Sequence, residues 1–493
     1  MTDSMTKAEK NRLIVALSLA MLLAAIEGTI VTLAIPAIVG DLRGFDLISH
    51  VFSVYLLTGA LATPVYGKLS DLYGRKRMLI IGIVLFLVGS ALCGLARNMA
   101  MLIGFRALQG LGAGSVYTVP MVIVGDVFPL HERGKVQGSL SMVWGVAGLL
   151  GPFLGGLLID LLSWHWIFFI NIPFGILTLF ILQTSFHEDV HRQKHHIDYP
   201  GILVLTAAMS AFLGIFIFSG EGASVLTLRN AALLALSLVL LLVFYRIERR
   251  SPEPIVPLEV LTRSSVFVNI VSLLFMAALL GIDVYTALYL QNVKGFSPLV
   301  AGLLILPMSI TWMLVSIPLG RLMLRFGGKA LNAVGIIIAL LGLLPFLVFA
   351  QDTPAVLIVA VLSVLGVGFG IAMTTQMMVI QESVGFEKRG AAVAVNSLVR
   401  TLGQTVGISI FGVLFNSGII RGFAAEGIAR YDLANLYDLT VYPPDVGWGQ
   451  VVSVLVGAFH MVYAVLIAIT VLCVALSLVM PRPSSAEQRE REL

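Results

Sequence analysis

The chain has 493 residues, of which 58% are hydrophobic and 12% are charged. Soluble domains have about 45–50% apolar and about 25% charged residues, so this composition excludes a soluble protein. The net charge of +4 does not indicate nucleic-acid binding, because the cations lie in the connections between apolar stretches. These stretches are about 20 residues long, which is the length of a helix that crosses a bilayer. They predict an all-α polytopic membrane protein.

The apolar stretches, taken in chain order, predict fourteen transmembrane helices. Six centre near residues 24, 58, 87, 112, 147 and 174, and two more near residues 209 and 238. The last six centre near residues 277, 310, 340, 367, 402 and 466. We expect an N-terminal six-helix bundle (1–186), a linker with two extra helices (187–262), a C-terminal six-helix bundle (263–480) and a tail (481–493).

The basic residues predict the orientation. Most of the 31 Lys and Arg residues fall in alternate connections, beginning with the N-terminus and including the connection around Arg75. Because cytoplasmic loops are enriched in Lys and Arg, both termini are predicted to be cytoplasmic, in the inner or plasma membrane of the cell. The longest polar segment, Ser417 to Gln450, would then face outside as a short hairpin or helix over the outer mouth.

The cysteines and histidines predict neither a disulfide nor a metal site. Cys93 and Cys473 both fall inside apolar stretches, as small buried hydrophobic side chains do. His187, His191 and His195 follow each other at helical i, i+4 spacing and could bind Zn²⁺ together. A solvated cytoplasmic linker is the interpretation we favour for this histidine tract.

Four ionisable residues lie inside apolar stretches, where a charge costs several kcal/mol and usually serves a function. They are Glu27, Arg106, Asp283 and Arg400. From a rise of 1.5 Å per residue, Glu27 and Arg106 both lie about 21 Å from the cytoplasmic face, so we expect them to share a layer. Asp283 lies higher, at roughly 27 Å, and Arg400 lower, at about 17 Å.

These charges suggest proton coupling. Burial generally raises the pKa of a carboxyl group and a nearby arginine lowers it, so an acid under both influences can exchange a proton near neutral pH. A proton and a cationic substrate can then compete for the same negative charge. We expect Glu27 to be the main coupling acid, with Asp283 secondary and Arg106 as partner. The alternative for each acid is a permanently paired, structural charge.

A further set of residues is expected to line a substrate cavity, because polar and adaptable side chains occur there within apolar stretches. The set is Tyr55, Gln109, Phe275, Met276, Tyr285, Gln376, Asn396 and Arg400. For each of them, ordinary packing between helices is the alternative.

The connection between the second and third stretches carries a recognisable motif. Residues 67–77 read GKLSDLYGRKR, which resembles the signature loop of the major facilitator superfamily. The motif positions are Gly67, Asp71, Gly74 and Arg75. The resemblance implies that Gly67 permits close helix contact and that Asp71 caps a helix of the other half. It also implies that Arg75 pairs with an acid at the end of the fourth helix, here Asp126.

Three further stretches resemble the fourteen-helix drug:proton antiporter family of this superfamily. The first contains Arg106 and resembles the buried-arginine helix. The second resembles the antiporter motif, with Ala147 in place of a glycine, and its positions are Gly138, Gly151, Pro152, Gly155 and Gly156. The third, IEGTIVTLAIP, has Glu27 where the family has Asp. The glycines are expected to contact the second half of the protein closely and to seal a proton leak.

The resemblance implies two six-helix bundles that rock about a midplane site, and proton-coupled antiport of amphipathic, cationic drugs or toxic compounds. Small amphipathic molecules, protons and the lipid bilayer would be the partners of a monomer, with no cofactor beyond the proton gradient. One alternative is a dedicated exporter of a single physiological solute or lipid. Another is a non-transporting membrane sensor. The sequence has neither a nucleotide-binding loop nor a nucleophile–base set, so we expect no enzyme.

Overall fold

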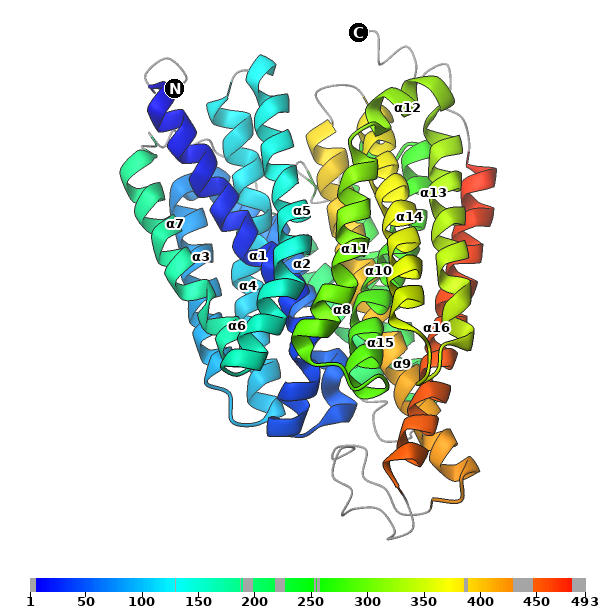
Figure 1. Cartoon of the computed structure of the whole chain (residues 1–493). Coiled ribbons are helices and arrows are strands. Elements are labelled where there is room, and N and C mark those ends of the chain that lie inside the picture. The colour runs from blue at the N-terminus through cyan, green and yellow to red at the C-terminus, as the bar shows by residue number, and fades with distance from the viewer. Residues whose placement is uncertain are drawn as a thin grey trace. The chain divides into compact units, whose positions relative to one another are not determined.

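A computed structural model describes residues 6–128, 130–186, 188, 198–217, 227–251, 254, 258–384, 389–428 and 447–480. Every regular element in these ranges is a helix, which confirms the predicted all-α class (Figure 1). The chain forms two compact units. Unit 1 comprises Met1–Arg43, His50–Met209 and Leu240–Ile255, and unit 2 comprises Gly44–Ser49, Ser210–Val239 and Val256–Leu493.

The helices of unit 1 follow one another with short connections. They are α1 (Lys7–Leu42), α2 (Ile48–Tyr73), α3 (Arg75–Gly94), α4 (Met99–Val127), α5 (Leu130–Leu161), α6 (Trp166–Phe169) and α7 (Asn171–Ser185). The helix α1 begins at a capping box, in which the Thr6 hydroxyl accepts the backbone N–H of Glu9 and the Glu9 carboxylate accepts that of Thr6. Such a box satisfies two N–H groups that have no partner within the helix.

Unit 2 contains the remaining long helices. They are α10 (Arg263–Asn292), α11 (Pro298–Ser316), α12 (Leu319–Phe326), α13 (Gly328–Leu343), α14 (Ala355–Glu382), α15 (Arg389–Ala425) and α16 (Trp448–Val479). Short 3₁₀ turns are η1 (Phe45–Leu47), η2 (Leu258–Val260) and η3 (Leu344–Val348).

The helices α8 (Tyr199–Ile217) and α9 (Leu228–Glu248) are divided between the two units. The sequence assigned them to a linker segment of their own, 187–262, and those boundaries stay a prediction.

Twelve helices of the described chain are long and apolar enough to span a membrane. Two shorter apolar helical stretches, Val146–Leu161 and Tyr199–Phe212, lie where the other two expected crossings fall. The count of fourteen therefore stays a prediction, while the multi-pass character follows directly from the twelve.

The expected outer segment is partly helical. The helix α15 continues through Ala425 and α16 begins at Trp448, so both ends of the segment extend these two helices. Residues 429–446 lie outside the described ranges.

Small residues set the distance between neighbouring helices in unit 1. Figure 1 shows α3 and α4 packed along each other. A Cβ at Gly89 of α3 would lie 2.5 Å from the backbone nitrogen of Gln109 on α4, so only glycine fits there. Close backbone approach of this kind is how membrane helices gain packing contacts where no hydrophobic effect drives them together.

We therefore expect Gly89→Ala to destabilise the protein by about 1–3 kcal/mol, the usual cost of forcing extra volume into a packed core. The measurement is the thermal unfolding midpoint in detergent. Gly104→Ala in α4 is the matched control, because a Cβ at Gly104 would meet nothing within 4 Å. Equal midpoints for the two variants would contradict the packing assigned to Gly89.

Candidate functional site

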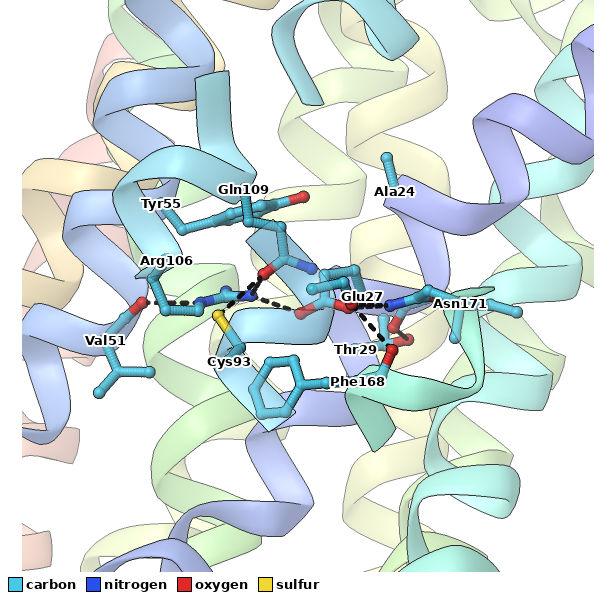
Figure 2. A network of polar contacts seen from close by, with 12 residues as sticks. Ala24, Glu27, Thr29, Val51, Tyr55, Cys93, Arg106, Gln109, Phe168 and Asn171 are labelled. Atoms are coloured by element: carbon cyan, nitrogen blue, oxygen red, sulfur yellow. Dashed lines mark hydrogen bonds and ion pairs between the residues drawn. The ribbon is translucent and has the colours of Figure 1, made fainter. Parts of the chain in front are cut away.

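An ion pair between Arg106 of α4 and Glu27 of α1 is the centre of a polar network in unit 1 (Figure 2). The relative exposure of Arg106 is 1% and that of Glu27 is 0%. Arg106 Nη1 donates to Glu27 Oε1 and also to Gln109 Oε1, the latter over 2.8 Å. The expectation that Glu27 and Arg106 share a layer is confirmed.

The rest of the Arg106 guanidinium group is also engaged. Its Nε donates to the carbonyl oxygen of Val51 over 3.2 Å. Its Cζ lies 4.0 Å from the centroid of the Tyr55 ring, which is cation–π geometry. Figure 2 shows the guanidinium group between Val51 and Glu27, with Tyr55 beside it. Arg106 is therefore held by α1, α2 and its own helix.

The second carboxylate oxygen of Glu27 has its own donor. Asn171 Nδ2, at the start of α7, donates to Glu27 Oε2 over 2.7 Å and to Ser90 Oγ over 2.9 Å. Ser90 Oγ in turn donates to the carbonyl oxygen of Phe168 over 2.8 Å. A buried charge is tolerated when it is paired and hydrogen-bonded, and both conditions hold for Glu27. Glu27 is fully buried, and each of its carboxylate oxygens already accepts a hydrogen bond.

Asp283 of α10 has a different environment. It forms no hydrogen bond or ion pair with any residue that the structure describes, and it keeps partial exposure. Its neighbours along the helix, Ile282 and Val284, are fully buried. The acid that the sequence ranked second is thus the one without a partner.

A second polar network, made of neutral groups, crosses unit 2. Asn396 Nδ2 of α15 donates to Asn269 Oδ1 over 2.8 Å and to Ser272 Oγ over 3.2 Å, both on α10. Ser272 Oγ donates to Gln376 Oε1 of α14 over 2.8 Å. Buried amides and hydroxyls in a membrane bundle need such partners, because no water or lipid group replaces them.

The network continues to two more helices. Gln376 Nε2 donates to Asn332 Oδ1 of α13 over 3.0 Å, and Asn332 Nδ2 donates to Ser477 Oγ of α16 over 2.9 Å. Sequence reasoning named Gln376 and Asn396 but missed Asn269, Asn332 and Ser477. A usable signal was present: each is a polar residue within an apolar stretch and lies two turns or less from an end of its helix, the N-terminal end for Asn269 and Asn332 and the C-terminal end for Ser477.

The residues expected to line a substrate cavity divide into two groups. Those buried within their own unit are Tyr55, Gln109, Phe275, Tyr285, Gln376 and Asn396. Met276 and Arg400 keep partial exposure. Phe275 packs on Phe369 with ring centroids 4.6 Å apart, and Tyr285 packs edge-on against Phe415 at 5.1 Å. The buried group fills helix interfaces here, and its place in a cavity stays a prediction.

The signature loop makes the expected ion pair. Arg75 Nε lies 2.8 Å from Asp126 Oδ2, and Arg75 Nη1 donates to Ser70 Oγ over 2.8 Å. Because the Asp126 side chain is 48% exposed, this pair contributes about 0–1 kcal/mol to stability. Gly74 has φ 96°, a left-handed conformation that favours glycine at this turn.

The structure differs from the family pattern at Gly67. A Cβ there would lie 3.8 Å from Thr118 Cγ2, an ordinary contact, so no close approach requires glycine. Asp71 lies in α2, but its side-chain surroundings fall outside what the structure describes.

Glu188 is a residue of this loop that sequence reasoning missed. Its carboxylate accepts the backbone N–H of Arg75 over 2.7 Å and that of Lys76 over 2.8 Å. These N–H groups form the first turn of α3, where the helix dipole favours an anion. Glu188 lies in the segment that sequence analysis treated only as a linker.

The glycines of α5 contact α1 of the same unit. A Cβ at Gly151 would lie 1.9 Å from Thr29 Oγ1, and one at Gly155 would lie 2.8 Å from Ile30 Cγ1. Thr29 Oγ1 also donates to the carbonyl oxygen of Ala147 over 3.3 Å. The expected partner, the second half, was therefore wrong for these two positions: small residues predict a close neighbour but not which helix it is.

The remaining motif positions on α5 are Gly138, Pro152 and Gly156. Pro152 lies inside the helix and Gly156 is buried. The surroundings of Gly138 fall outside the described part of the chain, as does the histidine tract 187–196 apart from Glu188. Elsewhere in the described ranges, no group of three His, Cys, Asp or Glu side chains could hold a metal ion.

The two acids should respond differently to neutralisation. Glu27→Gln leaves Arg106 buried without a counter-ion, and breaking a buried pair costs about 3–5 kcal/mol. Asp283→Asn removes a charge without breaking a pair. We expect a lower thermal unfolding midpoint in detergent for Glu27→Gln and partial recovery in the double variant Glu27→Gln/Arg106→Gln. A larger loss in Asp283→Asn than in Glu27→Gln would contradict the network.

Comparison with known proteins identifies the family. Residues 17–408 match the model of the Major Facilitator Superfamily. The chain is 31% identical to "Multidrug transporter protein MdtP" of Bacillus subtilis, over 83% of this chain and 76% of the relative. It is also 31% identical to "Multidrug efflux pump SdrM" of Staphylococcus aureus, over 82% of this chain and 90% of the relative.

Solved structures agree on the fold. A bacterial homologue of the human lysosomal transporter Spinster, in an inward-facing and unoccupied conformation, matches with a TM-score of 0.72 and 16% identity, over 99% of both chains. A D-xylose–proton symporter matches with a TM-score of 0.63 and 14% identity, over 96% of this chain and 98% of that one. The chain belongs to the Major Facilitator Superfamily and is a multi-pass membrane transporter, not an enzyme.

Proposed function

We propose that this transporter is a proton-coupled antiporter that exports amphipathic, cationic compounds of several chemical types by alternating access. Relatives of about 31% identity named as multidrug transporters or efflux pumps support the drug-export part. The distribution of basic residues supports placement in the cell membrane with both termini cytoplasmic. The proton gradient would supply the energy to a monomer that needs no cofactor.

The observation that carries the coupling proposal is the contrast between the two membrane acids. Glu27 is neutralised by Arg106 and hydrogen-bonded by Asn171. Asp283 has no such partner among the described residues and keeps partial exposure. A lone acid in hydrocarbon is costly when ionised, so it gains most from a proton or from a substrate cation.

Exchange then follows because a proton and a cationic substrate compete for the Asp283 carboxylate. A proton on Asp283 neutralises the charge while the site faces the acidic side, and a cationic substrate replaces the proton on the other side. The geometry thus favours Asp283 as the main exchange site, the reverse of the order suggested by the sequence. Glu27 and Arg106 would act as a second, conditional site that opens only when their pair is broken.

The test is pH-gradient-driven transport of ethidium, a permanent cation, in proteoliposomes. We expect Asp283→Asn to reduce coupled transport to background, because the variant can bind neither the proton nor the cation electrostatically. Asp352→Asn, an exposed acid of the same unit, is the matched control and should transport normally.

Two outcomes would count against the proposal. Undiminished ethidium transport by Asp283→Asn would remove this carboxylate from the mechanism. Transport of one chemical class only, in a panel of cationic, zwitterionic and neutral amphipathic compounds, would favour the dedicated exporter.

A further inference from the structure

Arg400 of α15 is a partly exposed cation within a membrane-spanning helix, and none of the described residues is its counter-ion. Its Nη2 donates to the carbonyl oxygen of Met373 on α14 over 3.0 Å, and its Nε is buried with no hydrogen-bond partner. No carboxylate in the described ranges forms an ion pair with it. Arg106 of unit 1, by contrast, has a carboxylate, an amide, a carbonyl oxygen and an aromatic ring around its guanidinium group.

Two amide side chains lie about one helical turn from Arg400 and from its partner Met373, and neither neutralises Arg400. One turn away on the same helix is Asn396, and one turn from Met373 on α14 is Gln376. Both belong to the neutral network of unit 2. Asn396 Oδ1 is buried and has no hydrogen-bond partner, so the network has an unused acceptor on a residue one helical turn from Arg400. An amide oxygen can accept a hydrogen bond from a guanidinium group, but it is neutral and therefore does not cancel the positive charge of that group.

Asp283, the other membrane charge of unit 2, is too far away to pair. The helices α10 and α15 run in the same direction and in register. A Cβ at Gly403 would meet Leu273, one at Gly407 would meet Ala277, and one at Gly281 would meet Phe411. In this register Arg400 lies level with residue 270. Asp283 is thirteen residues further along, or about 20 Å at 1.5 Å per residue.

An uncompensated guanidinium group in a membrane bundle is costly unless an anion meets it. Its partial exposure gives such an anion access. Arginine is well suited to a carboxylate, because its planar fork can donate two parallel hydrogen bonds to the two oxygens. Nη2 is directed to Met373, which leaves Nε and Nη1 for this purpose.

We propose that Arg400 is an anion subsite that binds the carboxylate of transported compounds, with the unpartnered Asn396 oxygen, one helical turn away on α15, as an acceptor for a donor group of the same compound. The inference rests on the proposed export function and extends its substrate class from cations to zwitterionic amphipathic molecules. This subsite is separate from the exchange site, because Asp283 lies about 20 Å further along the unit.

The test measures equilibrium binding of two dyes that differ in one group. Rhodamine B carries a carboxylate, and its ethyl ester does not. Binding to purified full-length protein in detergent is followed by fluorescence anisotropy, for the unaltered protein and for Arg400→Gln, Arg400→Lys and Arg421→Gln. Arg421 is an exposed arginine on the same helix and provides the matched control.

We expect Arg400→Gln to lower the ratio of rhodamine B affinity to ester affinity about tenfold, as expected for the loss of a charge-assisted contact. Arg400→Lys should retain part of the preference, and Arg421→Gln all of it. Ester binding shows in every variant that the protein is folded. An unchanged ratio in Arg400→Gln would overturn the subsite.

An anionic lipid headgroup, whose phosphate has no cationic group beside it, is the rival anion. The binding series is therefore repeated in nanodiscs of phosphatidylcholine with and without phosphatidylglycerol. Persistence of the carboxylate preference in both supports a substrate subsite. Loss of the preference on adding phosphatidylglycerol, in unaltered protein, would assign Arg400 to lipid instead. Because binding requires no pH gradient, failure here leaves proton coupling intact, and ester-driven proton release tests that coupling separately.

Discussion

The cost of placing a charge in hydrocarbon is the constraint on which the two units depend, and they meet it differently. In unit 1 the Glu27 carboxylate neutralises Arg106, while Gln109, Asn171 and the Val51 carbonyl satisfy the remaining groups. The network joins α1, α2, α3, α4 and α7, so the same contacts that neutralise the charges also hold the helices together. Within that unit, chemistry at Glu27 requires the packing to change.

In unit 2 the polar groups that hold the helices together are different from the charged groups. The polar contacts between its helices are made by neutral amides and hydroxyls that link α10, α13, α14, α15 and α16. Its two membrane charges, Asp283 and Arg400, have no ion-pair partner among the described residues. The structural network can therefore remain intact while the charges gain or lose a proton, a cation or an anion. This division supports the proposal that unit 2 contributes the titrating and binding groups.

Sequence reasoning succeeded where a physical rule depends only on position along the chain. A membrane helix must satisfy its own backbone hydrogen bonds, so length and hydropathy predicted the all-α fold. The constant helix rise predicted that Glu27 and Arg106 share a layer. The resemblance of residues 67–77 to the superfamily's signature loop predicted the pair between Arg75 and Asp126.

The failures concern direction around the helix axis. Helices that are apolar on all sides have little periodicity, so the sequence does not show which face meets which neighbour. For that reason Gly151 and Gly155 were assigned to the wrong partner. Asn171 and Glu188 were missed because their partners lie 144 and more than 100 positions away in the chain. The ranking of Glu27 above Asp283 used its depth, its level with Arg106 and its match to the family's helix-1 acid, and did not include the hydrogen bonds that satisfy Glu27.

The central claim is that Asp283 carries the exchangeable proton while Glu27 stays ionised in its pair with Arg106. Infrared difference spectroscopy of the purified protein, recorded on adding ethidium at neutral pH, measures this directly. The account predicts loss of a protonated-carboxyl band that is absent from Asp283→Asn and retained in Glu27→Gln. A band that disappears in Glu27→Gln and persists in Asp283→Asn would contradict it.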